Sequence, residues 1–282
     1  MDVPPLLSNF EAHLKLAGKE NCLEKGDIEQ VYCFVLNITR SKLYLNRDLG
    51  LNSNNISIIN TYIQRRIKGE PLAYILGNKG FWNLDLMVNS AVLIPRPETE
   101  TLVYLILKSL NEHMELKLID LGTGSGAIAL SLASARKNWE IYGLDKSIEA
   151  LKVAKINAKT LNLKIKLILG NWTSSIAEGV FDVVVANPPY IDSFDAALGG
   201  DGVRFEPKEA LVASENGYND IKEIITSSNL LKKGGSLYLE HSPRQTRLVK
   251  KTLRNSGFET IITHEDLNGD QRVTSAKKIN ER

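Results

Sequence analysis

Short apolar segments alternate with longer helical stretches through the second half of the chain, and this alternation constrains the fold more than any other feature. The segments are 117–121, 140–144, 165–169, 183–186 and 236–239. Strands separated by helices form βαβ units, whose sheet is covered by helices on both faces. Two further runs, near 258–263 and 272–276, flank the turn Asn268-Gly269-Asp270 and predict an antiparallel addition. The sequence therefore predicts a doubly wound, mostly parallel α/β sheet of seven strands.

The first 78 residues have a helical pattern instead. Ser8 is the expected cap of a first helix, Asp27 with Gln30 forms a capping-box pattern for a second, and Ser53 is the expected cap of a third. Apolar residues recur at helical spacing after each of these positions. We therefore expect a small all-α bundle over residues 1–78.

The spacing of apolar residues changes between this bundle and the sheet. Leu84, Leu86 and Val88 alternate, Asn89-Ser90 is expected to turn, and 91–94 is a second extended run. This pattern predicts a β-hairpin connector over residues 79–96. Pro97 then stands where a first helical residue belongs. We expect the catalytic domain to occupy residues 97–282.

Charge and cysteine content exclude some partners. The 35 basic and 33 acidic residues leave a net charge of +2, which provides no strong field for a nucleic-acid backbone. Cys22 and Cys33 do not have metal-like spacing, and no metal is expected. The chain has neither a leader-like start nor a long uninterrupted apolar stretch. We expect a monomeric cytoplasmic protein that binds neither nucleic acid nor membrane.

A glycine-rich turn follows the first strand of the predicted sheet. Asp120-Leu121 ends the strand, and Gly122-Thr123-Gly124-Ser125-Gly126 leads into a helical stretch. Glycines there let a ligand approach the backbone closely. Asp145 ends the next strand, where a carboxylate can accept both hydroxyls of a ribose. A nucleoside cofactor is the natural inference.

The glycine turn by itself leaves alternatives open. Gly122, Gly124 and Ala127 also satisfy the dinucleotide fingerprint, and Asp145 would serve NAD equally well. A tight turn that binds no ligand gives the same glycines. Asp145 is also compatible with an ordinary cap for a helix that starts near Ser147.

A polar and rigid tetrad, Asn187-Pro188-Pro189-Tyr190, follows the fourth predicted strand. Ligands of open parallel sheets bind outside the carboxyl ends of the strands, where this tetrad must lie. The Asn187 Oδ1 and the Pro188 carbonyl can accept the two N–H bonds of a planar nitrogen, while Pro188 and Pro189 fix the backbone and Tyr190 packs against the planar group. The plainer reading is a strand terminator. The tetrad favours methyl transfer to a planar nitrogen.

Asp120, Asp145 and the tetrad come at successive strand ends, and no residue pattern for hydride transfer is found. This arrangement resembles the class I S-adenosylmethionine methyltransferases. In that family the first acidic residue lies near the methionine portion, the glycine loop passes under the cofactor and the second acidic residue holds the ribose. The resemblance implies S-adenosyl-L-methionine as cofactor and S-adenosyl-L-homocysteine as product, with Asp120, Gly122, Thr123, Gly124, Ser125, Gly126 and Asp145 as binding residues.

The tetrad occurs in enzymes that act on adenine N6, cytosine N4 or glutamine N5, and flanking residues distinguish these classes. The flanking stretches here include Gly69-Glu70-Pro71, Phe81-Trp82, Leu93-Ile94-Pro95-Arg96-Pro97-Glu98-Thr99-Glu100, Gly170-Asn171-Trp172, Arg204-Phe205-Glu206-Pro207 and Glu240-His241. With these the chain resembles the PrmC (HemK) family of protein-(glutamine-N5) methyltransferases. That family modifies the glutamine of the Gly-Gly-Gln motif in class 1 peptide chain release factors.

The resemblance implies roles for further parts of the chain. The helical domain would bind the release factor, Trp172 would lie beside the adenine with Asn171 next to it, and residues 192–203 would border the substrate channel. Trp172 also fits a plain core aromatic residue, and 192–203 a loop without contacts. Asn171 stands where the family usually has aspartate, which favours weaker cofactor binding. Glu240 and His241 have no role at this stage.

Two other functions compete with release-factor methylation. A nucleic-acid adenine-N6 methyltransferase would need a basic face or a base-flipping recognition domain, and neither the charge nor the helical amino terminus suggests one. A non-catalytic scaffold that binds the cofactor would leave the complete tetrad unexplained. The resemblance to the PrmC (HemK) family therefore favours a glutamine-N5 methyltransferase over these two alternatives.

Overall fold

The structure is a computed structural model that describes residues 9–19, 23–45, 51–172, 176–200 and 202–279. The chain divides into two compact units. One contains Met1–Gly77 together with Gly199–Phe205, and the other contains Asn78–Leu198 with Glu206–Arg282. The segment after the tetrad therefore contributes to both units. The predicted boundaries at 78/79 and 96/97 remain predictions, and by its contacts the hairpin belongs to the same unit as the sheet.

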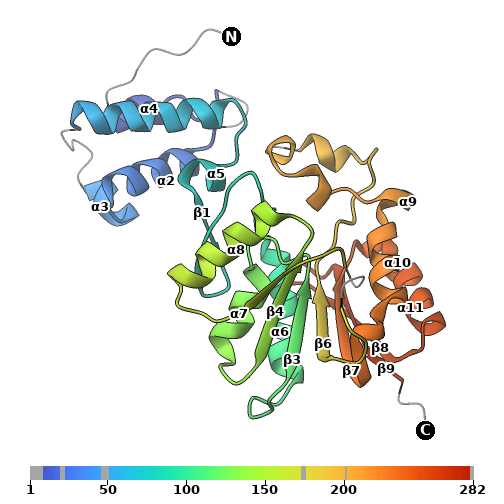
Figure 1. Ribbon diagram of the computed structural model, residues 1–282. Coiled ribbons are helices and arrows are strands. Elements are labelled where there is room, and N and C mark those ends of the chain that lie inside the picture. The colour runs from blue at the N-terminus through green and yellow to red at the C-terminus, as the bar shows by residue number, and fades with distance from the viewer. Residues whose placement is uncertain (1–8, 20–22, 46–50, 173–175, 201, 280–282) are drawn as a thin grey trace. The chain divides into compact units, whose positions relative to one another are not determined.

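The first unit is an all-α bundle, as predicted. Its helices are α1 (Phe10–Leu14), α2 (Lys25–Leu36), α3 (Arg40–Leu45), α4 (Ser53–Ile67) and α5 (Leu72–Leu76) (Figure 1). Phe10, Ile28, Tyr32, Ile59 and Ile63 are fully buried in its core. Burial of these apolar side chains stabilises helices that are too short to persist alone.

Two predicted helix caps are wrong by one or three residues. Glu24 caps α2 and forms a capping box with Asp27, which is the third helical residue and also accepts from Arg66 Nε at 3.0 Å. Asn52 caps α4, because its Oδ1 accepts from the Asn55 backbone N–H at 2.8 Å, so Ser53 is the first helical residue. Several consecutive polar side chains can each cap a helix, and sequence alone does not select one.

Some residues named in the sequence predictions lie outside the part of the chain that the structure describes. Ser8 and Cys22 lie outside the described residues; the cap of α1 is Asn9, whose Oδ1 accepts from Ala12 N at 2.8 Å. Cys33 is half-buried and carries a free thiol. Within the described ranges, no cluster of three or more His, Cys, Asp or Glu residues could hold a metal ion. None of the described helices has both the length and the apolar character needed to cross a bilayer.

The hairpin has a different register from the predicted one. Its strands are β1 (Asn78–Phe81) and β2 (Leu84–Met87), with Phe81 paired to Leu84 across a turn at Trp82-Asn83. The predicted second strand, 91–94, is irregular. Trp82 adopts a left-handed conformation (φ 56°), and its N–H donates to Glu100 Oε1 at 2.8 Å. That contact with a distant helix supports a turn that lacks the usual Asn-Gly signal.

The second unit contains the predicted seven-stranded sheet. Its strands are β3 (Lys117–Leu121), β4 (Glu140–Asp145), β5 (Lys166–Leu169), β6 (Phe181–Ala186), β7 (Leu231–Glu240), β8 (Phe258–Glu265) and β9 (Gln271–Lys278). The order is β5-β4-β3-β6-β7-β9-β8, parallel as far as β7, with β9 antiparallel to both of its neighbours. The doubly wound prediction and the antiparallel addition are confirmed.

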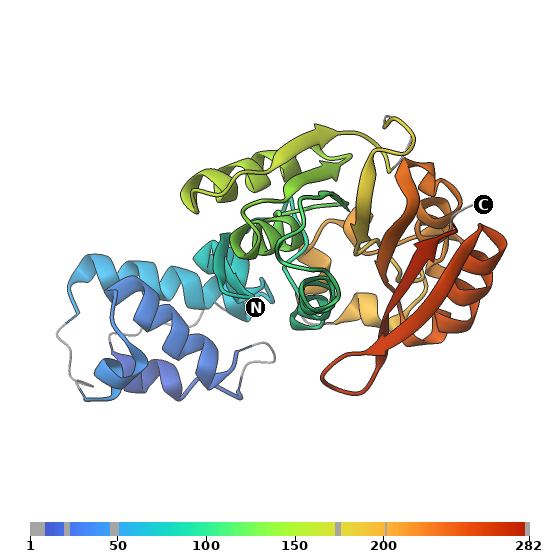
Figure 2. The same cartoon turned by 90° about the horizontal axis from the view of Figure 1, so that it is seen from below.

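Helices cover both faces of this sheet (Figures 1 and 2). They are α6 (Glu100–Ser109), α7 (Ala127–Ala135), α8 (Ile148–Thr160), α9 (Ser214–Gly217), α10 (Asn219–Thr226) and α11 (Thr246–Asn255), with short 3-10 turns at Pro97–Thr99, Ala196–Gly199, Lys208–Ala210, Ser228–Leu230 and Pro243–Gln245. A core with Leu102, Ile106 and Leu130 lies under α6 and α7, and another with Ile221 and Val249 lies under α10 and α11. Two buried faces explain why the parallel strands are continuous apolar runs.

Candidate active site

The glycine turn between β3 and α7 bends the backbone through conformations that favour glycine. Gly122, Gly124 and Gly126 have φ of 74°, 56° and 84°. A Cβ on Gly122 would come within 3.2 Å of the Trp172 ring. The N–H groups of Gly122 and Thr123 donate to the Leu144 carbonyl at 2.8 and 2.9 Å. This turn is therefore fixed against β4 and presents bare backbone to the space above the sheet.

Asp145 is the terminal residue of β4 and bridges two elements. Its Oδ2 accepts from Gly124 N at 2.9 Å, and its Oδ1 accepts from Ser147 N at 2.9 Å. Ser147, rather than Asp145, caps α8. Each carboxylate oxygen has a second lone pair, so Asp145 still has acceptor capacity for a diol. The residue therefore fits the predicted ribose-binding role. Its hydrogen bond with Gly124 also fixes the orientation of the glycine turn.

Asp120 lies beneath the turn and does not face the cofactor pocket. It is 1% exposed, and its Oδ2 accepts from Thr123 Oγ1 at 2.7 Å. Burial raises the pKa of this carboxyl to about 7, while the hydrogen bond from Thr123 favours the charged form. The carboxyl holds the turn from below.

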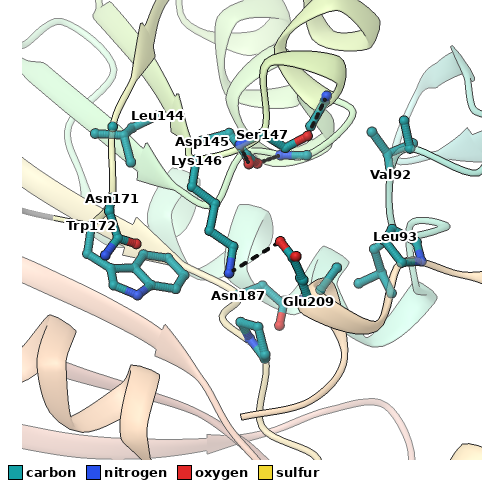
Figure 3. Close-up of a pocket in the computed structure, with 18 residues that line it drawn as sticks. Val92, Leu93, Leu144, Asp145, Lys146, Ser147, Asn171, Trp172, Asn187 and Glu209 are labelled. Carbon is teal, nitrogen blue, oxygen red and sulfur yellow. Dashed lines mark hydrogen bonds and ion pairs between the residues drawn. The ribbon is translucent and has the colours of Figure 1, made fainter.

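A pocket opens above the carboxyl ends of β3, β4 and β6, with an empty volume of about 740 Å³ that includes its open mouth. Figure 3 shows Asp145 and Ser147 on one side, Asn171 and Trp172 on another, and Asn187 at the base. Three different strand ends therefore contribute to one cavity, as expected for an open parallel sheet.

Trp172 forms one wall of this pocket. It is 7% exposed, adopts a left-handed backbone (φ 44°) and donates its indole N–H to Asp220 Oδ1 at 3.0 Å. The hydrogen bond fixes the ring beside Gly122, and the flat indole face suits a planar base. Asn171 is exposed and also lines the pocket.

The tetrad begins at the end of β6, next to the end of β7. Ala186 pairs with Leu239, so Asn187 lies level with Glu240. Asn187 Nδ2 donates to Thr99 Oγ1 at 2.9 Å, which leaves the Oδ1 as the acceptor of this amide. The Tyr190 hydroxyl donates to Glu240 Oε1 at 3.2 Å, and burial raises the pKa of Tyr190. The tetrad is thus anchored at both ends.

The chain segment before α6 is tied to the pocket rim by Glu206. This buried carboxylate accepts from the Ile94 N–H at 3.0 Å through its Oε2 and pairs with Arg96 through its Oε1. Val92 and Leu93 on one side, and Pro207 and Glu209 on the other, line the pocket. The Glu206 contacts therefore explain how two stretches more than a hundred residues apart form one rim.

Two segments of the chain match known families. Residues 6–77 match the PrmC N-terminal domain, and residues 100–198 match the Methyltransferase small domain. A release factor glutamine methyltransferase from Coxiella burnetii is 41% identical over 89% of this chain and 91% of its own length. One from Vibrio cholerae is 42% identical over 97% and 98%. The chain belongs to the release factor glutamine methyltransferase family.

Solved structures support the family's fold. A Pyrococcus furiosus methyltransferase covers 72% of this chain and 92% of its own, with a TM-score of 0.54 at 19% identity. A ribosomal protein L11 methylase from Lactobacillus delbrueckii covers 68% and 84%, with a TM-score of 0.51 at 16% identity. At such low identity these likenesses concern the fold alone.

Within this family member, the predicted site residues divide into two groups. Gly122, Gly124, Asp145, Asn171, Trp172, Asn187 and Pro189 line the pocket. Asp120, Thr123, Ser125, Gly126, Pro188 and Tyr190 do not line it. Their direct contact with ligand stays a prediction.

The structure also adds residues that the sequence reasoning did not single out. Lys146 and Glu209 form an ion pair at the mouth, with Lys146 Nζ 3.8 Å from Glu209 Oε2 (Figure 3). Thr99 holds Asn187 from the turn before α6. Lys146 follows Asp145 directly, which is the signal that could have identified it. Thr99 lies in a stretch that marked the family resemblance, but its contact depends on the tertiary fold.

His241, unassigned from sequence, is a structural residue. It is fully buried, its Nδ1 bonds the Ser242 carbonyl at 2.9 Å, and its Nε2 bonds Thr274 Oγ1 at 2.8 Å. The carbonyl requires a donor at Nδ1, so Nε2 of a neutral ring accepts from the threonine hydroxyl. Burial lowers the pKa of His241, in agreement with this neutral form.

Proposed function

We propose that this protein transfers a methyl group from S-adenosyl-L-methionine to the side-chain amide nitrogen of the glutamine in the Gly-Gly-Gln motif of class 1 release factors, leaving S-adenosyl-L-homocysteine. The observation that carries the proposal is the orientation of Asn187, whose Nδ2 is engaged by Thr99 and whose Oδ1 is left to accept an N–H. The family membership supports the choice of substrate.

The pocket fits the cofactor. Bare backbone at Gly122 and Gly124 leaves room that a side chain would fill, Asp145 keeps acceptor capacity for ribose hydroxyls, and Trp172 offers a flat apolar wall. Asn171 adds an amide without the charge of an aspartate. When bound, the cofactor supplies an electrophilic methyl group on a sulfonium. These residues would hold its adenosine part.

The tetrad's task is to position a weak nucleophile. An amide nitrogen has its lone pair conjugated with its carbonyl, as a rotation barrier of roughly 18–20 kcal/mol shows. The Asn187 Oδ1 and the Pro188 carbonyl would accept the two N–H bonds and stabilise positive charge that develops on the nitrogen. Pro188 and Pro189 keep both acceptors immobile. Alignment of two reactants can contribute on the order of 7–11 kcal/mol.

Other parts of the chain would recognise the protein substrate. The helical domain, residues 1–78, is proposed to bind the release factor, and 192–203 to border the substrate channel. Phe194, just after the tetrad, is 96% exposed and offers an apolar ring to a protein partner. Phe34 on α2 is 44% exposed and could contribute similarly in the bundle.

The test mixes the protein with S-adenosyl-L-methionine and a release factor that carries either Gly-Gly-Gln or Gly-Gly-Ala. Mass spectrometry of the motif peptide should show one added methyl group on the Gln form and none on the Ala form. An unmodified Gln peptide would refute the proposal. Methylation of DNA or RNA in parallel reactions would favour an adenine-N6 enzyme, and cofactor binding without any turnover would favour a scaffold.

A further inference from the structure

A buried carboxyl group lies behind the tetrad and outside the cofactor pocket. Glu240, the last residue of β7, is 0% exposed. Its Oε1 accepts from the Tyr190 hydroxyl at 3.2 Å. Its Oε2 is buried and has no hydrogen-bond partner among the residues that the structure describes. Such a group costs folding free energy, so its presence calls for a role.

The surroundings of Glu240 resist ionisation. Burial raises the pKa of this carboxyl to about 7, although hydrogen bonds from the Thr99 and Tyr190 hydroxyls and the charge of Arg272 favour the carboxylate. Glu98 acts in the opposite direction. Arg272 is itself paired with Asp266, with Nε 3.4 Å from Oδ2. The Tyr190 hydroxyl, 3.2 Å from Oε1, is therefore the direct hydrogen-bond partner of Glu240.

Thr99 holds the other end of the tetrad. Thr99 is 4% exposed, and its Oγ1 accepts from Asn187 Nδ2 at 2.9 Å. Asn187 and Tyr190, the first and last tetrad residues, are thus held by Thr99 and by Glu240.

We propose that Glu240 is a positioning residue for the tetrad: it fixes the Tyr190 ring at one end, while Thr99 fixes the Asn187 amide at the other. The register of β6 against β7 brings Glu240 level with Asn187, so the neighbouring strand provides the anchor. Buried networks of this kind restrict side chains to one arrangement. The inference deepens the proposed function, on which it rests for its kinetic test.

The kinetic test compares Glu240→Gln, Glu240→Met and Thr99→Val in methylation of a Gly-Gly-Gln release factor. Glu240→Gln keeps an acceptor for Tyr190 and should retain kcat within about 3-fold. Glu240→Met preserves volume but removes the acceptor of the Tyr190 hydroxyl, and Thr99→Val frees the Asn187 amide; each should lower kcat by about 10- to 100-fold. KM for the release factor and Kd for S-adenosyl-L-methionine should stay within about 2-fold.

The matched control is Thr274→Val, which removes a buried hydrogen bond to His241 at the same end of the sheet. A merely structural role would make Glu240→Met resemble this control, with a lower unfolding midpoint and unchanged kcat. That result would overturn the proposal. So would a rise in the Kd for S-adenosyl-L-methionine by the same factor as the fall in kcat. If Glu240→Met does not fold, Thr99→Val with unchanged kcat has the same meaning.

A second measurement does not depend on the substrate. Tyr190→Phe should lower the urea midpoint of the otherwise unchanged protein but leave it nearly unchanged in the Glu240→Met background, because the hydroxyl has already lost its partner. If the two substitutions together lowered the urea midpoint by the sum of their separate effects, the Tyr190–Glu240 hydrogen bond would not couple the two residues, and this part of the proposal would be overturned. This cycle remains informative if the unsubstituted protein methylates no release factor, an outcome that would refute the proposed function alone.

Discussion

Gly217 offers a sharp test of how tightly the tetrad must be held. It ends α9, a short turn in which Glu215, Asn216 and Gly217 are all left-handed, with φ of 52°, 58° and 77°. A Cβ at Gly217 would lie 2.4 Å from the Tyr190 carbonyl oxygen. That is about 1 Å closer than ordinary van der Waals contact. Gly217→Ala must therefore displace the last residue of the tetrad.

The Tyr190 carbonyl cannot simply swing away. Gln245 Nε2 donates to it at 3.2 Å and to the Gly217 carbonyl at 2.9 Å, so one amide fixes both carbonyls. The left-handed conformation costs alanine about 1–2 kcal/mol, and overpacking typically adds about 1–3 kcal/mol. A misplacement of about 1 Å can reduce a rate on the order of 100-fold.

Gly257→Ala is the matched control. Gly257 has φ of 75°, and a Cβ there would meet nothing within 4 Å. This variant should lose only the free energy of unfolding that the left-handed conformation costs an alanine, about 1–2 kcal/mol. The comparison uses urea unfolding, release-factor methylation and calorimetric titration with S-adenosyl-L-methionine. The free energy of unfolding of Gly217→Ala should be about 1–3 kcal/mol lower than that of the control. Its kcat should fall by about 10- to 100-fold, and its Kd for S-adenosyl-L-methionine should be nearly unchanged. Equal kcat in both variants would refute the reasoning.

Three further predictions concern the pocket and the glycine turn beside it. Asp145→Asn should raise the Kd for S-adenosyl-L-methionine by about 10-fold or more, because it removes the charge that holds the Gly124 N–H and that is proposed to hold the ribose hydroxyls. Calorimetric titration measures this Kd, and an unchanged value would contradict the proposed ribose-binding role. Cofactor binding should change the intrinsic tryptophan fluorescence, and Trp172→Phe should abolish that change; persistence of the signal would assign it to another tryptophan. The raised pKa of Asp120 means that the folded state holds a proton that the unfolded chain releases, so this group's contribution to stability falls as pH rises from 3.8 to about 7. Asp120→Asn should reduce that slope in urea unfolding across this range, and an identical slope in both proteins would exclude the contribution.

The succession of strands along the chain and the place of the tetrad after one of them follow from local sequence. Each strand of the parallel sheet is a short apolar run, and each run lies beside a helical stretch or turn that separates it from the next. The glycine turn and Asp145 are recognisable because their backbone requirements are local. The motifs of the family resemblance could be identified for the same reason, and the relatives confirm the family.

Two local predictions failed because local signals were ambiguous. The alternation at Leu84 and Leu86 was compatible with a turn on either side of the strand, and the actual turn at Trp82-Asn83 depends on the Glu100 carboxylate. Likewise, Glu24 rather than Asp27 caps α2, while Asp27 is held by Arg66 from α4. In both cases a residue distant in the chain decides between equivalent local choices.

The sequence by itself determined the seven-stranded sheet and the family, and it placed the glycine turn and the tetrad at strand ends, because periodicity, glycine turns and proline act within a few residues. Only the tertiary structure decided what holds the tetrad. Thr99 meets Asn187 across 88 positions because the turn before α6 lies beside the end of β6. Glu240 meets Tyr190 across 50 positions because parallel strands bring their carboxyl ends to one edge. A buried carboxyl has no local signature, since its role depends on the hydroxyls that the register of neighbouring strands places beside it.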